Sequence, residues 1–128
     1  MHENEISEKI IGAAIEVHKI LGPGLLESVY EEALCHEFYL RGINFLRQQN
    51  VPIPYKGVKL DTVLRLDLLV EDKVIVDLKA KTRLSEIDKP ELLTYLRLKE
   101  LHLGLIINFH KPILRDGIHR VVNKLKDP

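Results

Sequence analysis

Apolar residues recur at helical spacing in two stretches near the start of the chain. In residues 6–21 they fall at three- and four-residue intervals, and Gly22-Pro23-Gly24 then ends the pattern. In residues 25–40 a second apolar face follows the same spacing, and Gly42 stands where helix C-termini commonly carry glycine. The spacing therefore predicts two amphipathic helices.

The middle of the chain changes to shorter runs that are rich in β-branched residues. Residues 43–53 read as a strand, although Pro52 and Pro54 restrict its end to a sheet edge or a bulge. After a turn at residues 55–58, two apolar runs at 59–70 and 73–80 flank a short polar turn. This pattern predicts a β-hairpin.

The last third of the chain predicts one more helix and strand. Pro90 suits the first turn of a helix over residues 90–100, and the continuous apolar run 103–109 is typical of a buried strand. A loop and a final short element over 117–125 complete the chain. With no repeat or linker in the sequence, we expect residues 1–128 to form one α/β domain with a mixed sheet covered by helices.

Composition narrows the class of protein. The chain has 128 residues, of which 45% are hydrophobic and 30% charged, which is typical of a globular domain and argues against disorder. No apolar run approaches the roughly 18 residues that a membrane span needs, and the polar N-terminus does not read as a signal peptide. Cys35 is the only cysteine, which excludes an internal disulfide and a cysteine-cluster zinc site. We therefore expect a cytoplasmic protein with no membrane partner.

Charge is balanced overall but unevenly distributed. Residues 1–37 hold eight acids and two bases (8 − 2, a net −6), whereas residues 38–128 hold seventeen bases and eleven acids (17 − 11, a net +6). One interpretation is a basic surface near the predicted hairpin. The other is that the helices carry solvated glutamates.

The hairpin carries the polar residues that are the strongest candidates for a functional site. A turn centred on Asp72 places Asp67 opposite Asp77, and alternation places Lys79 and Arg65 on the same face. The other face is expected to be entirely apolar: Leu64, Leu66, Leu68, Val70, Val74, Val76 and Leu78. Opposed carboxylates repel each other, so this pair calls for a cation, either a metal ion or neighbouring Lys and Arg side chains.

Two interpretations of this group stay open. Carboxylates on adjacent strands suit Mg²⁺, which prefers oxygen ligands, and Lys79 just beyond them would orient or deprotonate water or stabilise a transition state at phosphorus. The same spacing also fits a surface ion-pair ladder on a half-exposed sheet.

Four residues on the predicted helices are further candidates. Glu27 lies in the first turn of the second helix, where the helix dipole alone favours an acid, but it can also lean over the sheet and complete a metal site. Tyr30, one turn later, is either a core residue or a hydroxyl donor. Glu91 and Tyr95 share a face of the third helix and are either a solvated edge or groups that position a substrate.

Several of these residues together resemble a known family. The run from Gly24 to Tyr30 matches a GxxExxY signature, and the two hairpin strands around Asp67 and Asp77-Leu-Lys79 look like the second signature of the same proteins. Residues 92–96 and 104–109 look like their C-terminal half. Over about residues 10–122 the chain resembles the GxxExxY family of the PD-(D/E)xK nuclease superfamily.

The resemblance implies a fold and a site. The fold is a restriction-endonuclease-like core of α-β-β-β-α-β order around a four-stranded mixed sheet, here with an extra N-terminal helix. Asp67, Asp77 and Glu27 would be metal-binding carboxylates, with Mg²⁺ or Mn²⁺ as cofactor, and Lys79 the catalytic lysine. Two positions depart from the family: Asp77 stands where Glu is commoner, and Glu91 stands where similar proteins carry Gln.

The leading functional hypothesis is a Mg²⁺-dependent nuclease that hydrolyses phosphodiester bonds in DNA or RNA. The competing hypothesis is a catalytically inactive nuclease fold used as a binding or assembly module, and a third is an enzyme acting on another phosphate ester. We also expect a homodimer, with the first helix as the contributor to its interface.

Overall fold

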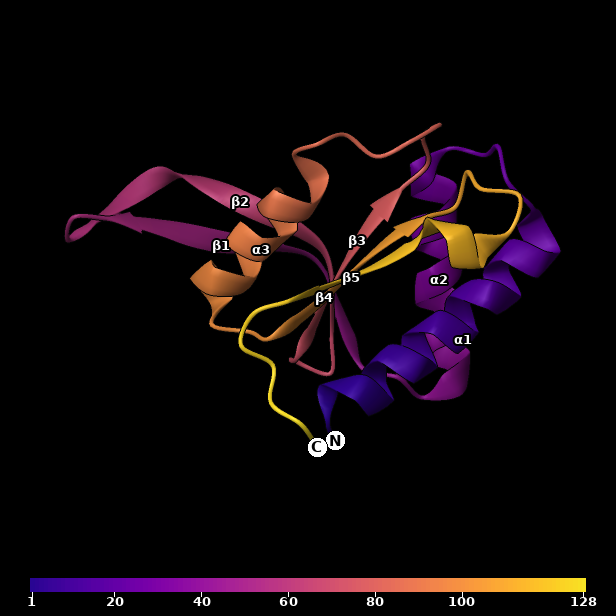
Figure 1. Ribbon diagram of the computed structural model, residues 1–128, viewed down its shortest axis with the longest axis horizontal. Coiled ribbons are helices and arrows are strands. Elements are labelled where there is room, and N and C mark those ends of the chain that lie inside the picture. Colours follow the sequence, from indigo (N-terminus) through magenta and orange to yellow (C-terminus); the bar gives the residue numbers. More distant parts are fainter.

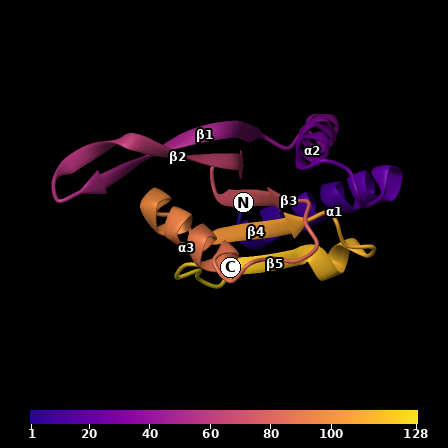
Figure 2. The same cartoon turned by 90° about the horizontal axis from the view of Figure 1, so that it is seen from above.

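Two helices cover one face of a five-stranded sheet and a third helix covers the other (Figures 1 and 2). This arrangement is seen in a computed structural model that describes residues 1–128. The helices are α1 (Glu3–Leu21), α2 (Glu27–Arg41) and α3 (Asp88–Lys99). The strands are β1 (Phe45–Tyr55), β2 (Val58–Val70), β3 (Val74–Lys79), β4 (Leu103–Asn108) and β5 (Ile118–Val122), with a short 3₁₀ helix at Leu114–Gly117 before β5.

The strand order is β1-β2-β3-β4-β5 and the sheet is mixed, as predicted. Antiparallel pairing joins β1 to β2, β2 to β3 and β4 to β5, whereas β3 and β4 run parallel because α3 carries the chain back between them. The final short element predicted from the sequence is β5, so the sheet has five strands where the resemblance implied four. The order of elements is otherwise the α-β-β-β-α-β core with an extra N-terminal helix.

Each face of the sheet has its own hydrophobic core. The larger core joins α1 and α2 to the inward side chains of the central strands, and Tyr30, Phe38 and Phe109 are fully buried in it. The smaller core joins α3 to the opposite face through Leu92 and Leu96. Gly104 on β4 allows this close packing, because a Cβ there would lie within 3 Å of the Leu92 side chain.

The prediction of which hairpin side chains share a face is correct for the residues after Asp67 and wrong for Leu64 and Leu66, which precede it. Leu68, Val70, Val74, Val76 and Leu78 do share the face toward α1 and α2. By contrast, Leu66 is buried in the opposite core and Leu64 packs against it. The physical reason is a local distortion: the β1–β2 ladder skips Gln48, which has a left-handed φ of 53°, and its partner position Asp67.

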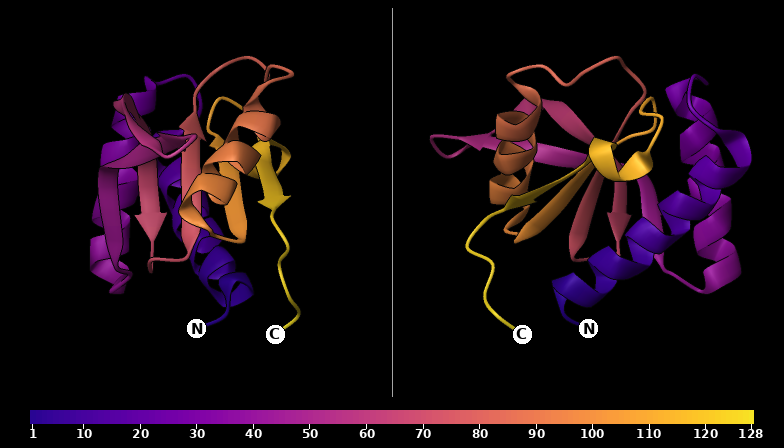
Figure 3. Two further views of the ribbon diagram at one scale, coloured as in Figure 1. Left: turned by 90° about the vertical axis from the view of Figure 1, so that its left-hand side faces the viewer. Right: turned by 45° about the vertical axis from the view of Figure 1, so that its right-hand side comes forward.

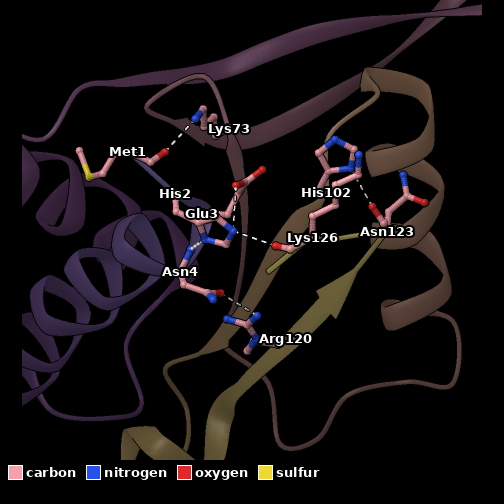
Figure 4. Close-up of polar contacts among 9 residues, drawn as sticks. All are labelled: Met1, His2, Glu3, Asn4, Lys73, His102, Arg120, Asn123 and Lys126. Atoms are coloured by element: carbon pink, nitrogen blue, oxygen red, sulfur yellow. Dashed lines mark hydrogen bonds and ion pairs between the residues drawn. The ribbon is translucent and has the colours of Figure 1, made fainter. Parts of the chain in front are cut away.

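The two termini lie side by side at one end of the molecule (Figure 3). His2 caps α1 by accepting a hydrogen bond from the Asn4 N–H, and its Nε2 lies 2.8 Å from the Lys126 carbonyl oxygen (Figure 4). Lys73 in the β2–β3 turn and Arg120 on β5 hold the first residues as well. This network fixes α1 to the end of the sheet that is remote from Lys79, since Lys73 precedes β3 and Lys79 ends it. No helix has both the length and the apolar character needed to cross a membrane.

Beyond the body of the protein, β1 and β2 continue as a two-stranded arm (Figures 1 and 2). Its strands pair from Asn50–Arg65 to Tyr55–Val58, with a register shift between Pro52 and Pro54. The shift is the bulge that the two prolines predicted.

Candidate active site

The site begins where β2 and β3 separate. Their ladder pairs Val70 with Val74 and ends at Leu68–Val76, which confirms the turn centre at Asp72. Asp67 follows at the point of separation and takes the place of a strand partner, because its Oδ2 accepts a 2.8 Å hydrogen bond from the backbone N–H of Leu78. The sequence therefore places a carboxylate inside the sheet rather than on its surface.

Asp77 supplies a second carboxylate beside the first. Its Oδ1 lies 3.5 Å from the Lys79 Nζ, whereas its Oδ2 is buried and has no hydrogen-bond partner. Burial is the main cause that raises the pKa of Asp77 to about 7; Lys79 opposes this effect and Asp67 adds to it. An unpartnered carboxylate oxygen in a buried position is costly, which is typical of a group that serves a ligand.

Crowding of negative charge extends to Asp67 and Glu27. Burial raises the pKa of Asp67, although the hydrogen bond from the Leu78 N–H acts against it. The pKa of Glu27 is also raised, first by burial and then by the charge of Asp67. Asp67 is therefore close enough to repel both Glu27 and Asp77, the second of which the sequence predicted as its opposed partner.

A cavity of about 180 Å³ joins these residues to two helices. Glu27 reaches it from the start of α2, and Glu91 and Tyr95 reach it from α3. Its other polar lining residues are Arg65, Asp67, Asp77 and Lys79. The structure thus brings together every candidate residue except Tyr30. Glu91 and Tyr95 line this cavity instead of a solvated helix edge; the pKa of Tyr95 is raised by burial and by the charge of Glu91.

Tyr30 lies in the core behind the site. Its ring is fully buried and stacks on Phe109 with 4.5 Å between ring centroids. Its hydroxyl donates a 2.5 Å hydrogen bond to the Gly22 carbonyl and accepts one from the Leu25 N–H at 3.1 Å. The sequence offered two alternatives for Tyr30, a core residue or a hydroxyl donor, and the structure shows that it is both. It braces the loop before Glu27 and touches no part of the cavity.

Lys79 lies between two carboxylates from different elements. Its Nζ is 3.5 Å from Asp77 Oδ1 and 3.9 Å from Asp88 Oδ1, and Asp88 also pairs with Lys81 at 2.6 Å. Burial lowers the pKa of Lys79, but Asp77 and Asp88 outweigh that effect and raise it. Lys79 is therefore held as a cation at the edge of the cavity.

Asp88 is a site neighbour that sequence reasoning missed. It is 4% exposed and accepts a 2.7 Å hydrogen bond from the Ser85 N–H at the start of α3. The available signal was the spacing Ser85-x-x-Asp88, which is the arrangement of a capping box before a helix. Asn108 at the end of β4 fixes the same region, because its side chain bonds both the N–H and the carbonyl of Lys81.

Glu31 is a second neighbour of the site, and no motif in the sequence singles it out. It lies one turn after Glu27, is 8% exposed, and accepts hydrogen bonds from Arg47 and Gln48, each at 2.7 Å. These contacts hold β1 where its ladder with β2 is interrupted opposite Asp67. The kink that opens the site is thus fixed by a helix that lies outside the hairpin.

The oxygen donors of the cavity suit a hard divalent cation that is held by two carboxylates. No three Asp, Glu, His or Cys side chains form a ready metal-binding group in the structure. The donors present are the Asp67–Asp77 pair, including the unpartnered Asp77 Oδ2, with Glu27 at the rim of the cavity. Mg²⁺ is commonly held by one or two carboxylates together with waters and substrate phosphates, so the pair suits it.

Comparison with known proteins assigns this arrangement to a family. Searches of curated proteins and of solved structures found no match. A family model described as the PD-(D/E)XK nuclease superfamily matches residues 4–121. That superfamily is named for an acid followed two residues later by lysine, which is the spacing of Asp77 and Lys79 at the end of β3. The chain therefore belongs to the PD-(D/E)XK nuclease superfamily.

Proposed function

We propose that this protein is a metal-dependent nuclease that hydrolyses phosphodiester bonds in DNA or RNA. The observation that carries the proposal is the buried, unpartnered Oδ2 of Asp77 beside Asp67, with the Lys79 ammonium 3.5 Å from Asp77 Oδ1. Membership of a nuclease superfamily supports nuclease chemistry, and nuclease superfamilies of this kind generally use divalent metals. The choice of Mg²⁺ or Mn²⁺ and the roles of single residues are our proposal.

Asp67 and Asp77 would hold the ion, and Glu27 would join them by rotation of its exposed side chain. A bound divalent cation supplies Lewis-acid stabilisation of phosphoryl oxygens and lowers the pKa of water. The carboxylates contribute by pre-organisation, because Leu78 fixes Asp67 and Lys79 fixes Asp77 before any substrate arrives.

Lys79 would stabilise negative charge on the reacting phosphoryl group. Asp77 and Asp88 keep it protonated, so its ammonium can donate hydrogen bonds to oxygens that gain charge in the transition state. Tyr95 and Glu91 would position the substrate from the α3 side of the cavity. Glu91 brings a negative charge, so its contact is better suited to a base or sugar hydroxyl than to a phosphate.

The decisive experiment is a cleavage assay on a panel of labelled DNA and RNA with Mg²⁺, Mn²⁺ or EDTA. We expect cleavage with metal, none in EDTA, and none from Lys79→Ala or Asp77→Ala. Isothermal titration with Mn²⁺ should show binding to Lys79→Ala and loss of binding to Asp77→Ala, because the lysine is not a ligand. Lys126→Ala, at an exposed position near the C-terminus, is the matched control and should cleave normally.

Absence of cleavage with every metal and substrate would overturn the nuclease proposal. It would leave the alternative of an inactive nuclease fold that serves as a binding or assembly module. In that case Lys79→Ala and Asp77→Ala should leave partner binding unchanged.

Three finer proposals accompany this one. We place the protein in the GxxExxY group, supported by Gly24, Glu27 and Tyr30, of which Tyr30 braces the loop that presents Glu27. We propose a cytoplasmic location, consistent with a single buried cysteine. We propose a homodimer with α1 at its interface, where Ile20 is 71% exposed. Light scattering at tens of micromolar would refute the dimer if it reported only monomer.

A further inference from the structure

The β1–β2 arm is the least supported part of the fold. From Pro52 to Val63 nearly every side chain is exposed, and beyond α3, which packs at its base, no helix covers either side of the ribbon (Figures 1 and 2). An isolated two-stranded hairpin is only marginally stable in water. The arm nevertheless exposes large apolar side chains: Tyr55 60%, Val58 61%, Leu60 39% and Val63 42%.

The charges of the arm favour a polyanionic partner. Lys56, Lys59 and Arg65 all have exposed side chains, and Asp61 is the only acid between Pro52 and Arg65. Arg65 lines the cavity that holds Asp67 and Asp77, whereas Lys56 stands in the turn at the far end of the arm. Positive charge therefore lies at both ends of the arm, with Arg65 at the site and Lys56 and Lys59 near the tip.

The shape of the arm suits the major groove of duplex DNA. Ten residues separate Asp67 from Gly57 at the tip, or about 33 Å at roughly 3.3 Å per residue, so the arm is long enough to contact DNA beyond the candidate active site. The major groove of B-form DNA, about 12 Å wide, admits a two-stranded β-ribbon, whereas the major groove of duplex RNA is too narrow for side chains to enter.

We propose that the β1–β2 arm binds in the major groove of duplex DNA on one side of the candidate active site. Lys56 and Lys59 would contact phosphates, and exposed apolar side chains such as Tyr55 and Val58 would lie against thymine methyl groups. The inference deepens the proposed nuclease function, on which it rests for the location of the scissile phosphate, by naming duplex DNA as its substrate.

The test uses the double variant Lys56→Asn/Lys59→Gln. Lys56 has a left-handed φ of 48° and precedes Gly57, so Asn at this position gives the Asn-Gly turn that two-residue hairpins favour. The change removes two charges and the contact of the Lys56 ammonium with the Tyr55 ring, and it keeps a residue that suits the turn. Lys124→Gln/Lys126→Gln, at exposed positions near the C-terminus, removes the same charge and serves as the matched control.

Binding is measured by fluorescence anisotropy in EDTA, so the result does not depend on cleavage. For a 24-base-pair DNA duplex we expect the arm variant to bind at least tenfold more weakly than the native protein. The slope of log affinity against log salt should fall in magnitude by about 1.8, since each lost phosphate contact contributes about 0.9. The control variant should match the native protein throughout.

Three results would overturn the inference: native protein that does not bind the 24-base-pair duplex, an arm variant with unchanged affinity, or equal losses on duplex RNA and duplex DNA. A change in oligomeric state of the arm variant, seen by light scattering, would instead assign the arm to a second copy of the chain. The cleavage assay on the DNA and RNA panel separates the two proposals. Absence of cleavage with every metal and substrate, together with an intact binding result, would refute the nuclease and keep the arm.

Discussion

The backbone N–H of Leu78 donates a 2.8 Å hydrogen bond to the Asp67 carboxylate at the point where β2 and β3 separate. Asp67 thereby accepts a hydrogen bond from a backbone N–H of β3 that no longer has a backbone acceptor on β2. One carboxylate oxygen is committed to the fold, and the rest of the group faces the cavity. The same side chain therefore serves stability and the proposed metal site.

Two substitutions at Asp67 should separate these roles. In Asp67→Asn the amide oxygen still accepts from Leu78 and the repulsion with Asp77 is removed, so the free energy of unfolding should equal or exceed that of the native protein. In Asp67→Ala the Leu78 N–H loses its partner, which should cost about 1–3 kcal/mol relative to Asp67→Asn. Urea unfolding in EDTA measures the difference, and equal stability of the two variants would contradict the bonding role.

The raised pKa of Asp77 predicts that metal-free protein loses stability as pH rises. An unfolded aspartate releases its proton near its ordinary pKa of 3.8, whereas folded Asp77 releases it only near 7. Folded protein therefore holds the extra proton between these values, and the free energy of unfolding should fall across the window and level off above it. Asp77→Asn should be more stable than native protein at pH 8, on the order of 4 kcal/mol, and the gap should close below about pH 4. A gap that is constant with pH would refute the assignment.

Mg²⁺ should stabilise the native protein more at pH 8 than at pH 5.5. Protonated Asp77 is a poor ligand, so protons compete with the metal at the lower pH. A ligand that binds only the folded state raises stability by mass action, which predicts a rise of a few degrees in melting temperature at 10 mM Mg²⁺ and pH 8. Asp77→Asn should lose most of this rise. A rise of the same size in native protein and variant would place the bound ion elsewhere.

Much of the fold follows from local signals in the sequence. The β2–β3 register was predictable because the polar turn at Asp72 fixes which residues face each other, and the prolines of β1 correctly located a bulge on an edge strand. The ends of α1 and α2 were predictable from Gly22-Pro23-Gly24 and Gly42. At these positions the residue type itself sets the backbone conformation.

The missed features depend on contacts between elements that are distant in sequence. Alternation along β2 placed Leu66 with Leu68, but Glu31 on α2 holds Gln48 and Arg47 where the ladder breaks, and the side chains beyond the break face the other core. Asp88 reaches Lys79 only because α3 packs back over the parallel strands. The alternation of side chains along a strand contains no information on either of these contacts.

Asp88 should act as a positioning residue for Lys79 and Lys81. Its pKa is lowered, because its bonds with Lys81 and the Ser85 N–H outweigh the effect of burial. Its contribution to stability is therefore present above about pH 4 and is lost as pH falls through the folded pKa. Asp88→Asn should lower the free energy of unfolding by about 1 kcal/mol at pH 7, since Lys81 is partly exposed, and by almost nothing near pH 3. Glu86→Gln, an exposed neighbour, is the control and should have no effect at either pH.

Tyr30 offers the sharpest test of how the fold presents Glu27. Tyr30→Phe keeps the stack on Phe109 but removes the hydroxyl that joins the Gly22 carbonyl to the Leu25 N–H. The expected loss is about 1–2 kcal/mol in the free energy of unfolding. Because the ring has no surface in the cavity, KM should stay within twofold while kcat falls through looser placement of Glu27. Tyr39→Phe, at a tyrosine that is 76% exposed on α2, should change neither quantity. A large rise in KM with normal stability would instead mean that the Tyr30 hydroxyl reaches the substrate directly.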